Sequence, residues 1–308
     1  MFTDWLTRIK AWFGGPKSPP IIHVPPALPR TQSRYFVAQG VLATLFDEYA
    51  DHRQSLRGNE EIGWLLLGRR SDDEIHVVGT IPAGTHRDAS AVHVSFDIEA
   101  QTLASRIVRQ TDRRLQIVGI VHTHPGSMRH PSDGDLHGDK QWIRQLQYAE
   151  SLFAIGTADG RASAANASTT VVNGLCFSWY ALGADDADYR RAEIDVLAGA
   201  DVGSPLRDIW AAVEWSNKPI NRICQLFAAV RLGIITEDGV AWVRVAIVLP
   251  WPGQHLYVLL SSMEARYYWE DGQSLVAIDP QEADIEVALL MILTELTRKQ
   301  AEPWPKSR

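Results

Sequence analysis

The sequence predicts an α/β domain, in which helices flank a mixed sheet, followed by a smaller α+β domain. Segments with helical periodicity and segments with strand-like alternation follow one another along the first half of the chain. After Ala184 the composition shifts to a stretch rich in Asp, Ala and Gly, and the total of 308 residues exceeds the usual size of one domain. We therefore expect an N-terminal helix and linker over residues 1–33, a first domain over 34–185 and an accessory α+β domain over 186–308.

The N-terminal part combines an amphipathic segment with a proline-rich connector. Apolar side chains recur at helical spacing from Phe2 to Phe13, which predicts an amphipathic helix of about three turns. Asp4 and the lack of a long apolar run argue against a secretory signal. The aromatic residues also suit a membrane interface, but few basic residues accompany them, so we favour docking on this protein or on a partner. The prolines between residues 16 and 29 predict a stiff, extended connector.

The first domain is expected to begin with a helix, because Val41, Leu45 and Tyr49 share one face of a helix over residues 37–52. Short apolar runs bounded by turn residues predict the strands. The expected strands are 62–67, 75–81, 92–96, 115–122, 152–156 and 169–182, and the expected helices are 37–52, 98–109 and 135–149.

The second domain is expected to contain a helix, several strands and a final helix. Residues 185–205 are expected to carry a charged helix and a linker, and residues 209–232 a helix interrupted by a proline. Asp279 and Pro280 predict the cap and first turn of a last helix that ends at Arg298. The expected strands are 240–249, 256–260, 266–269 and 275–278. Many tryptophans and no catalytic spacing suggest a role in binding a substrate or a partner.

Composition narrows the classes of function. Hydrophobic residues at 45% and charged residues at 22% are typical of a soluble globular protein. The net charge of −7 argues against a nucleic-acid partner, because phosphate binding needs a basic surface. Two cysteines give no disulfide framework and suit a reducing compartment, so we expect a cytoplasmic protein. No segment reaches the roughly 20 apolar residues of a transmembrane segment.

One stretch of the chain carries the spacing of a metal site: His122-Thr-His124-Pro, then Ser132-Asp-Gly-Asp135. The apolar run before His122 predicts a buried strand, in which side chains two residues apart point to the same side. Pro and Gly then predict a loop, and Asp135 falls in the first turn of the following helix. Two histidines and one carboxylate leave the fourth tetrahedral position of a zinc ion open, which is typical of a catalytic site.

These residues resemble the JAMM signature, also called the MPN-plus metalloprotease motif, in its bacterial form. The resemblance covers residues 34 to 185 and implies a fold that is similar in outline to the cytidine deaminases. It implies that His122, His124 and Asp135 bind Zn²⁺ and that Ser132 helps to hold the tetrahedral intermediate. It also implies an upstream glutamate that acts as general acid and base on the metal-bound water.

Two adjacent residues are candidates for that glutamate. Bacterial members often show Glu-x-Gly-Gly-x-Leu-Leu-Gly, and aligning the closing Leu-Leu-Gly with residues 66–68 selects Glu61. A Glu-x-x-Gly variant aligned through Gly63 selects Glu60 instead. We choose Glu61, because that alignment keeps more positions, although Trp64 replaces the second glycine. Glu60 is then expected to be a solvated loop carboxylate.

The resemblance predicts a zinc-dependent peptidase or isopeptidase that cuts after the C-terminal tail of a ubiquitin-like protein, either to deconjugate or to mature it. The implied partners are the ubiquitin-like protein or its conjugates, with activating and conjugating (E1/E2-like) enzymes. A non-catalytic MPN scaffold and a DNA-associated protein of the RadC kind are the alternatives. His130 and His137 lie close to the motif and are expected to be partly exposed rather than ligands.

Overall fold

The computed structural model describes residues 33–85, 89–90, 93–94, 96–161, 165–227 and 229–301. The expected N-terminal helix and connector lie in residues 1–32, outside the described part, and so do residues 92 and 95 of the strand expected at 92–96. The chain divides into two compact units. Among the described residues, one unit comprises 33–101 and 111–207, and the other comprises 102–110 and 208–301.

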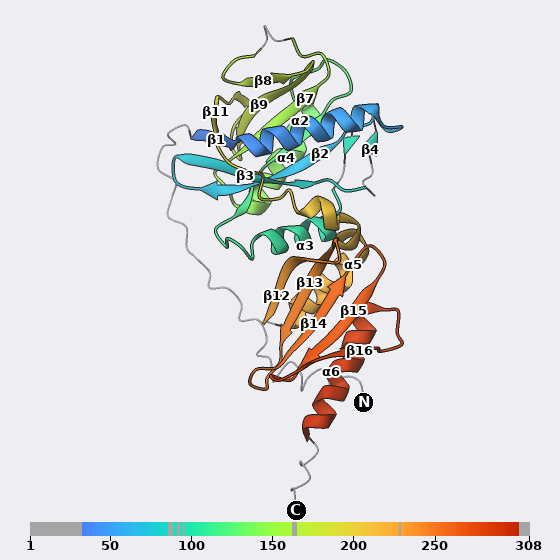
Figure 1. Cartoon of the computed structure of the whole chain (residues 1–308). Helices are drawn as coiled ribbons and strands as arrows, with labels where there is room; N and C mark the ends of the chain where they lie inside the picture. Colours follow the sequence, from blue (N-terminus) through green and yellow to red (C-terminus); the bar gives the residue numbers. More distant parts are fainter. Residues whose placement is uncertain are drawn as a thin grey trace, which may run out of the picture. The chain divides into compact units, whose positions relative to one another are not determined.

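The first unit is built on a curled mixed sheet of nine strands in its described residues, as expected (Figure 1). The strand order is β10-β9-β7-β6-β2-β3-β1-β11, and β8 pairs with β9. Three of the pairings are parallel: β1 with β3, β1 with β11, and β6 with β7. The strands are β1 (Arg34–Ala38), β2 (Gly63–Arg70), β3 (Glu74–Pro82), β6 (Gln116–Thr123), β7 (Glu150–Thr157), β8 (Thr169–Val172), β9 (Leu175–Gly183), β10 (Arg190–Arg191) and β11 (Ile194–Leu197). A separate short hairpin joins β4 (Ala89–Ser90) to β5 (His93–Val94).

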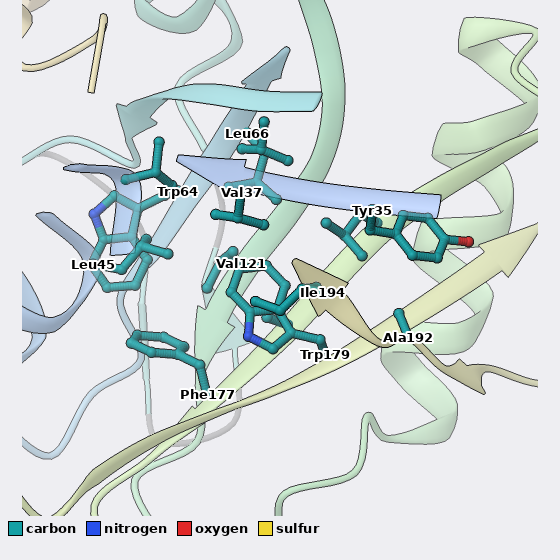
Figure 2. Close-up of a cluster of buried hydrophobic side chains, with 14 of the residues drawn as sticks. Tyr35, Val37, Leu45, Trp64, Leu66, Val121, Phe177, Trp179, Ala192 and Ile194 are labelled. Carbon is teal, nitrogen blue, oxygen red and sulfur yellow. The ribbon is translucent and has the colours of Figure 1, made fainter. Parts of the chain in front are cut away.

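Helices supply the second layer of this unit. Its helices are α2 (Gln39–Gln54) and α4 (Asp133–Leu146), whereas most of α3 (Ile98–Val108) belongs to the other unit. The apolar side chains Val41, Leu45 and Tyr49, spaced one turn apart, are fully buried on α2. They join a core cluster with residues of the central strands, and Figure 2 shows Leu45 close to Trp64 and Phe177. The rings of Trp64 and Phe177 lie 6.2 Å apart in an edge-to-face arrangement.

The central strands are buried on both faces. In β7, Leu152 and Ala154 belong to the core cluster under α2, whereas Phe153 and Ile155 belong to a second cluster with Ile143 of α4. This division follows from the period of two of a strand. The two helices thus cover opposite faces of the sheet, which explains why β7 is buried throughout.

The strand expected over 169–182 is wrong as a single element, because it is a hairpin. The chain turns at Asn173 and Gly174, whose φ angles are 48° and 83°. Asn-Gly is the favoured sequence of a type I′ turn, in which both central residues take positive φ. β8 and β9 therefore lie antiparallel to each other.

The residues expected to form a charged helix and linker, 185–205, instead return to the first sheet. β10 pairs with β9, and β11 pairs in parallel with β1. Asp201 then anchors the chain to β3, because its carboxylate accepts hydrogen bonds from Thr80 N at 2.9 Å and from Thr80 Oγ1 at 2.6 Å. The first unit therefore extends to Arg207, past the boundary expected at residue 185.

The second unit contains an antiparallel meander of five strands and two long helices. Its elements are α5 (Leu206–Leu226), β12 (Val230–Glu237), β13 (Val240–Val248), β14 (His255–Leu260), β15 (Ala265–Glu270), β16 (Leu275–Ile278) and α6 (Ile285–Ala301). Each strand pairs with the next along the chain, so β12 and β16 form the edges. None of the helices in the described residues is long and apolar enough to cross a membrane.

Two expectations for this unit are wrong. The helix expected to reach residue 232 ends at Leu226, and β12 follows because Asp238 and Gly239, both with positive φ, close a hairpin with β13. The last helix begins at Ile285 rather than at Pro280. Gln281 has a φ of 52°, which interrupts the helical path, and Asp284 caps the helix by accepting hydrogen bonds from the backbone N–H groups of residues 286 and 287.

Candidate metal centre

The two histidines lie where β6 ends between two neighbouring strands. His122 is paired with Gly63 of β2 on one side and with Ile155 of β7 on the other. His124 follows the last residue of β6, and its backbone N–H donates to the carbonyl oxygen of Gly156 at 2.8 Å. Both histidines are buried: 8% of the surface of His122 and 5% of the surface of His124 is exposed. Sheet hydrogen bonds therefore hold both side chains on a rigid part of the fold.

The third residue of the cluster comes from the first turn of α4, as expected. Oδ1 of Asp135 lies 3.3 Å from Nε2 of His122, and Oδ2 lies 3.6 Å from Nε2 of His124. The two Nε2 atoms are 3.2 Å apart. Among the described residues, these three form a group whose candidate ligand atoms all lie within 4.8 Å of one another.

A neighbouring carbonyl fixes the orientation of the second imidazole. Nδ1 of His124 lies 2.8 Å from the carbonyl oxygen of Met128, so the hydrogen belongs on Nδ1 and the lone pair on Nε2. A histidine that donates its other ring N–H to a carbonyl is the usual arrangement behind a metal ligand. The sequence did not reveal this contact, because a backbone acceptor leaves no signature in residue types.

Ser132 holds the carboxylate of Asp135. It is the N-cap of α4 and forms a capping box, in which the backbone N–H and Oγ of Ser132 donate to Oδ2 of Asp135 at 2.6 Å and 2.7 Å. The N–H of Asp135 in turn donates to Oγ of Ser132 at 3.2 Å. This local arrangement leaves Oδ1 of Asp135 turned toward His122.

The charges of the cluster are coupled. Burial acts to lower the pKa of His122, but its hydrogen bond and charge interaction with Asp135, helped by the charges of Asp139 and Glu61, raise that pKa. Burial acts to raise the pKa of Asp135, yet hydrogen bonds with His122, His124 and Ser132 hold it well below its usual range. The cluster thus stabilises both a carboxylate and positive charge beside it.

The donor set fits a divalent metal ion. Two imidazole nitrogens whose lone pairs face each other at 3.2 Å repel unless a proton or a cation lies between them. A cation would satisfy both nitrogens and the carboxylate at once. Imidazole and carboxylate ligands suit several divalent transition metals, zinc among them. His122, His124 and Asp135 could therefore hold a metal ion.

Glu61 lines the same cavity, and Glu60 is engaged elsewhere. The cavity has a volume of about 500 Å³, and Glu61, His124, Ser132 and Asp135 all contribute to its wall. Glu61 is 4% exposed, and its backbone N–H donates to the carbonyl oxygen of Ser90 at 2.8 Å. Oε2 of Glu60 instead accepts a hydrogen bond from Arg57 Nε at 2.6 Å. The structure thus brings the chosen glutamate, the serine and two of the expected ligands to one cavity.

A second carboxylate lies near the cluster, although sequence reasoning gave it no role. Asp139 follows Asp135 by one turn of α4, and Tyr189 donates a hydrogen bond to its Oδ2 at 2.7 Å. Burial raises the pKa of Asp139 to about 7, the Tyr189 hydrogen bond and the charge of His122 act to lower it, and the charge of Asp135 adds to the rise. The sequence does contain one indication of this contact, because Asp139 follows the predicted ligand Asp135 by four residues and so lies on the same face of the helix.

The other two histidines near the motif are not part of the cluster. The ring of His130 lies edge-on to that of Tyr180, with ring centres 5.3 Å apart, and its Nδ1 is 2.9 Å from the carbonyl oxygen of Pro131. His137 lies on the exposed face of α4.

The fold and the ligand cluster together define an α/β domain with a candidate metal centre at the end of its central strands.

Comparison with known proteins identifies the family of this domain. Residues 42–175 match the family model described as prokaryotic homologs of the JAB domain. No curated protein matches the chain. A JAB domain with this cluster is compatible with a metallohydrolase, and the family also includes non-catalytic members.

Two solved structures are similar to about half of the chain. One is a solution structure of a protein from Desulfitobacterium hafniense, with 19% sequence identity, coverage of 54% of this chain and 94% of the other, and a TM-score of 0.36. The second is a solution structure of a protein from Salinibacter ruber, with 18% identity, coverage of 52% and 90%, and a TM-score of 0.32.

Proposed function

We propose that this protein is a zinc-dependent peptidase or isopeptidase. The observation that supports this best is the cavity of about 500 Å³, where a buried carboxylate, Glu61, shares the wall with His124, Ser132 and Asp135. Three ligands leave one position of a tetrahedral ion open toward that cavity for water or substrate. A closed structural site would have no use for a buried carboxylate beside it.

The residues divide the chemistry of amide hydrolysis among them. Zn²⁺ at this site would act as a Lewis acid and lower the pKa of a bound water toward neutrality. Glu61 would take the proton of the attacking water and deliver it to the leaving amine, which an amide needs because the amide anion is a poor leaving group. His122, His124 and Asp135 would keep the geometry fixed through the reaction, because the sheet and the capping box already hold them.

Ser132 has two tasks in this proposal. In the structure its hydroxyl donates to Asp135 at 2.7 Å, so it positions a ligand. To stabilise the oxyanion of a tetrahedral intermediate, the same hydroxyl would turn its proton toward the substrate oxygen. The backbone N–H of Ser132, at 2.6 Å from Oδ2, would continue to hold the carboxylate meanwhile.

The substrate class follows from the resemblance to the bacterial JAMM proteins. We propose that the chain cleaves after the C-terminal tail of a ubiquitin-like protein in the cytoplasm, with E1/E2-like enzymes as further partners. The specific observation is the shape of the site: the Pro125–Gly126 segment and Met128 form part of the cavity wall, and Met128 is 54% exposed. An extended apolar and glycine-containing tail can approach such a wall closely.

A comparison of two substrates tests this function. The chain, supplied with Zn²⁺, is assayed with a ubiquitin-like protein linked through its C-terminus to a lysine-bearing fluorescent peptide, and with the fluorescent peptide alone in acylated form. We expect release from the first substrate at least tenfold faster than from the second, and loss of both on Glu61→Gln. A chain that binds Zn²⁺ and cleaves neither substrate would instead be a non-catalytic scaffold.

A further inference from the structure

The second unit carries an apolar groove between its edge strand and its last helix. The groove has a volume of about 510 Å³ and is lined by Trp269 of β15, by Val276 and Ile278 of β16, and by Met291 and Leu296 of α6, among others. Three charged side chains also line it: Asp279, Glu295 and Lys299. Its size and its mixture of apolar wall and few charges are typical of a site that binds several side chains of a ligand.

The apolar side chains around this groove are exposed. Val276 is 43% exposed and Met291 is 50% exposed, and Val287, which precedes Met291 by one turn of α6, is 43% exposed. β16 pairs only with β15, so this is also an open edge of the sheet in the described residues. Several large apolar residues exposed side by side on two adjacent elements indicate a surface that another element covers.

We propose that the covering element is the N-terminal segment of the same chain, residues 2–13. Its apolar residues are Phe2, Trp5, Leu6, Ile9, Trp12 and Phe13, which would form one continuous stripe on a helix. Such a stripe is unfavourable in water and is complementary to an apolar groove of this kind, the mode by which amphipathic helices bind grooves. The aromatic side chains are large enough to fill a volume of this size.

Charge favours the same pairing. The first 17 residues contain Arg8, Lys10 and Lys17 against the single acidic residue Asp4. In the groove, Glu295 is paired with Arg298 at 2.9 Å and lies 3.9 Å from Lys299, and Asp279 accepts a hydrogen bond from the backbone N–H of Gln281 at 2.9 Å. The acidic residues 282 and 284 follow Asp279 in the sequence. Residues 2–13 therefore carry a net positive charge, with two basic side chains against one acidic, whereas residues 279–284 at the groove hold three acidic side chains and no basic one.

The connector permits this intramolecular contact. Residues 14–32 separate the segment from Ser33, and a proline-rich chain of that length spans up to about 60 Å at ~3.1 Å per residue. Attachment to Ser33 therefore does not confine the segment to one unit. The groove and the segment belong to one chain, so the linker sets the local concentration of the segment near the groove. That concentration is in the millimolar range for short flexible linkers, and it is lower for a longer connector such as this one. Even a weak interaction would then keep the groove occupied.

Cysteine pairs in the full-length protein test the proposal directly. In a background with Cys224→Ala, Ile9→Cys is combined with Met291→Cys in the groove, or with Val240→Cys as the matched control. Val240 is 48% exposed, close to the 50% of Met291, and lies on the same unit away from the groove. We expect mild oxidation to form the Ile9–Met291 disulfide within a monomer in at least fivefold higher yield than the control pair.

Two results of this experiment would overturn the proposal. Equal yields for the two pairs would show that the segment has no preference for the groove. A disulfide found only in covalent dimers would show that the groove is occupied by the segment of a second copy. Either result can be read without any enzymatic assay, so the proposed function does not affect the interpretation.

A second measurement avoids the cysteines. Met291→Glu places a charge in the groove at an exposed position, and Val240→Glu is the control. We expect trypsin to cut after Arg8 and Lys10 at least fivefold faster in Met291→Glu than in either the wild type or the control. Equal cleavage rates in all three proteins would contradict the proposal. So would protection that appears only when phosphatidylglycerol vesicles are added, because the segment would then be a membrane anchor.

Discussion

Oδ2 of Asp135 accepts two hydrogen bonds from Ser132, one from the backbone N–H at 2.6 Å and one from the hydroxyl at 2.7 Å. The residue that caps helix α4 is therefore also the residue that orients the carboxylate of the candidate metal centre. A helix cap of this kind is stable by itself, because it satisfies backbone groups that the helix leaves unpaired. The ligand is thus positioned by local structure before any metal binds.

Ser132→Ala should weaken metal binding as well as helix α4. Removing the hydroxyl deletes one of the two donors to Asp135, and outer hydrogen bonds of this kind are typically worth 10–100-fold in metal affinity. We expect a loss in that range, with a fall of about 1 kcal/mol in the free energy of unfolding. Competition with a fluorescent zinc chelator measures the affinity for zinc, and urea unfolding measures the free energy of unfolding. Ser127→Ala, an exposed serine of the preceding loop, should leave both unchanged.

The ligand assignment predicts the metal content of purified protein. The wild type should bind about one Zn²⁺ per chain, since three ligands define one open site. His122→Ala and Asp135→Ala should each lose most of it, because two ligands bind zinc poorly. His137→Ala removes an exposed histidine of α4 and is the matched control. Elemental analysis after dialysis decides the matter, and full zinc content in both ligand variants would refute the assignment.

Glu61 and Glu60 should separate metal binding from proton transfer. Glu61→Gln keeps the size of a buried side chain that lines the cavity, so the variant should still bind zinc but lose at least a hundredfold in kcat for amide cleavage. Glu60→Gln should stay within about twofold of the wild type, because Glu60 is paired with Arg57. The opposite order of activities would assign the role of base to Glu60.

Asp139 should make stability depend on pH in the chelated protein. Its pKa is raised to about 7 in the folded state, chiefly by burial, so the folded protein holds this proton more tightly than the unfolded chain does. This contribution to stability is fully present below about pH 4, the pKa of an unfolded aspartate, and is lost as pH rises through about 7. Asp139→Asn should therefore match the wild type near pH 4 and exceed its stability at pH 8, by on the order of 1 kcal/mol after allowance for partial exposure.

Urea unfolding in EDTA at the two pH values measures this difference. Asp133→Asn, which removes an exposed carboxylate from the same helix, controls for the loss of a charge. A wild type that is more stable than Asp139→Asn at pH 8 would contradict the expected sign. Such a result would mean that the hydrogen bond from Tyr189 to the carboxylate outweighs the cost of its burial.

Two glycines in the same domain should respond to alanine in opposite ways. A Cβ at Gly119 of β6 would overlap the carbonyl oxygen of Leu152 on β7, so Gly119→Ala should cost more than about 3 kcal/mol or prevent folding. A Cβ at Gly138 of α4 meets nothing within 4 Å, and Gly138→Ala should stabilise the helix by about 0.5–1 kcal/mol. Urea unfolding of both variants checks the signs, and destabilisation by Gly138→Ala would contradict the exposed placement of that residue.

The candidate ligands could be predicted from the sequence because their positions depend on local structure. His122 is the last residue but one of β6, His124 directly follows that strand, and Asp135 stands in the first turn of the next helix, with only a short loop between them. Periodicity, loop residues and the capping serine are all visible in one stretch of sequence. The Asn173–Gly174 hairpin is equally local, but the apolar residues on both sides of its turn predict a single continuous strand.

The remaining features depended on contacts between distant parts of the chain. Which glutamate faces the cavity depends on the pairing of β2 with β6, in which Gly63 lies opposite His122, whereas the alignment of the sequence favoured Glu61 only by the number of matched positions. The pairing of β11 with β1 joins residues about 160 positions apart, and no residue type near position 185 predicts this pairing. A local pattern records the periodicity of each element, but the free energy that selects its neighbours comes from burial of surfaces and backbone hydrogen bonds across the whole sheet. The sequence by itself therefore determined the candidate metal ligands, and only the tertiary structure decided which surrounding residues share their cavity.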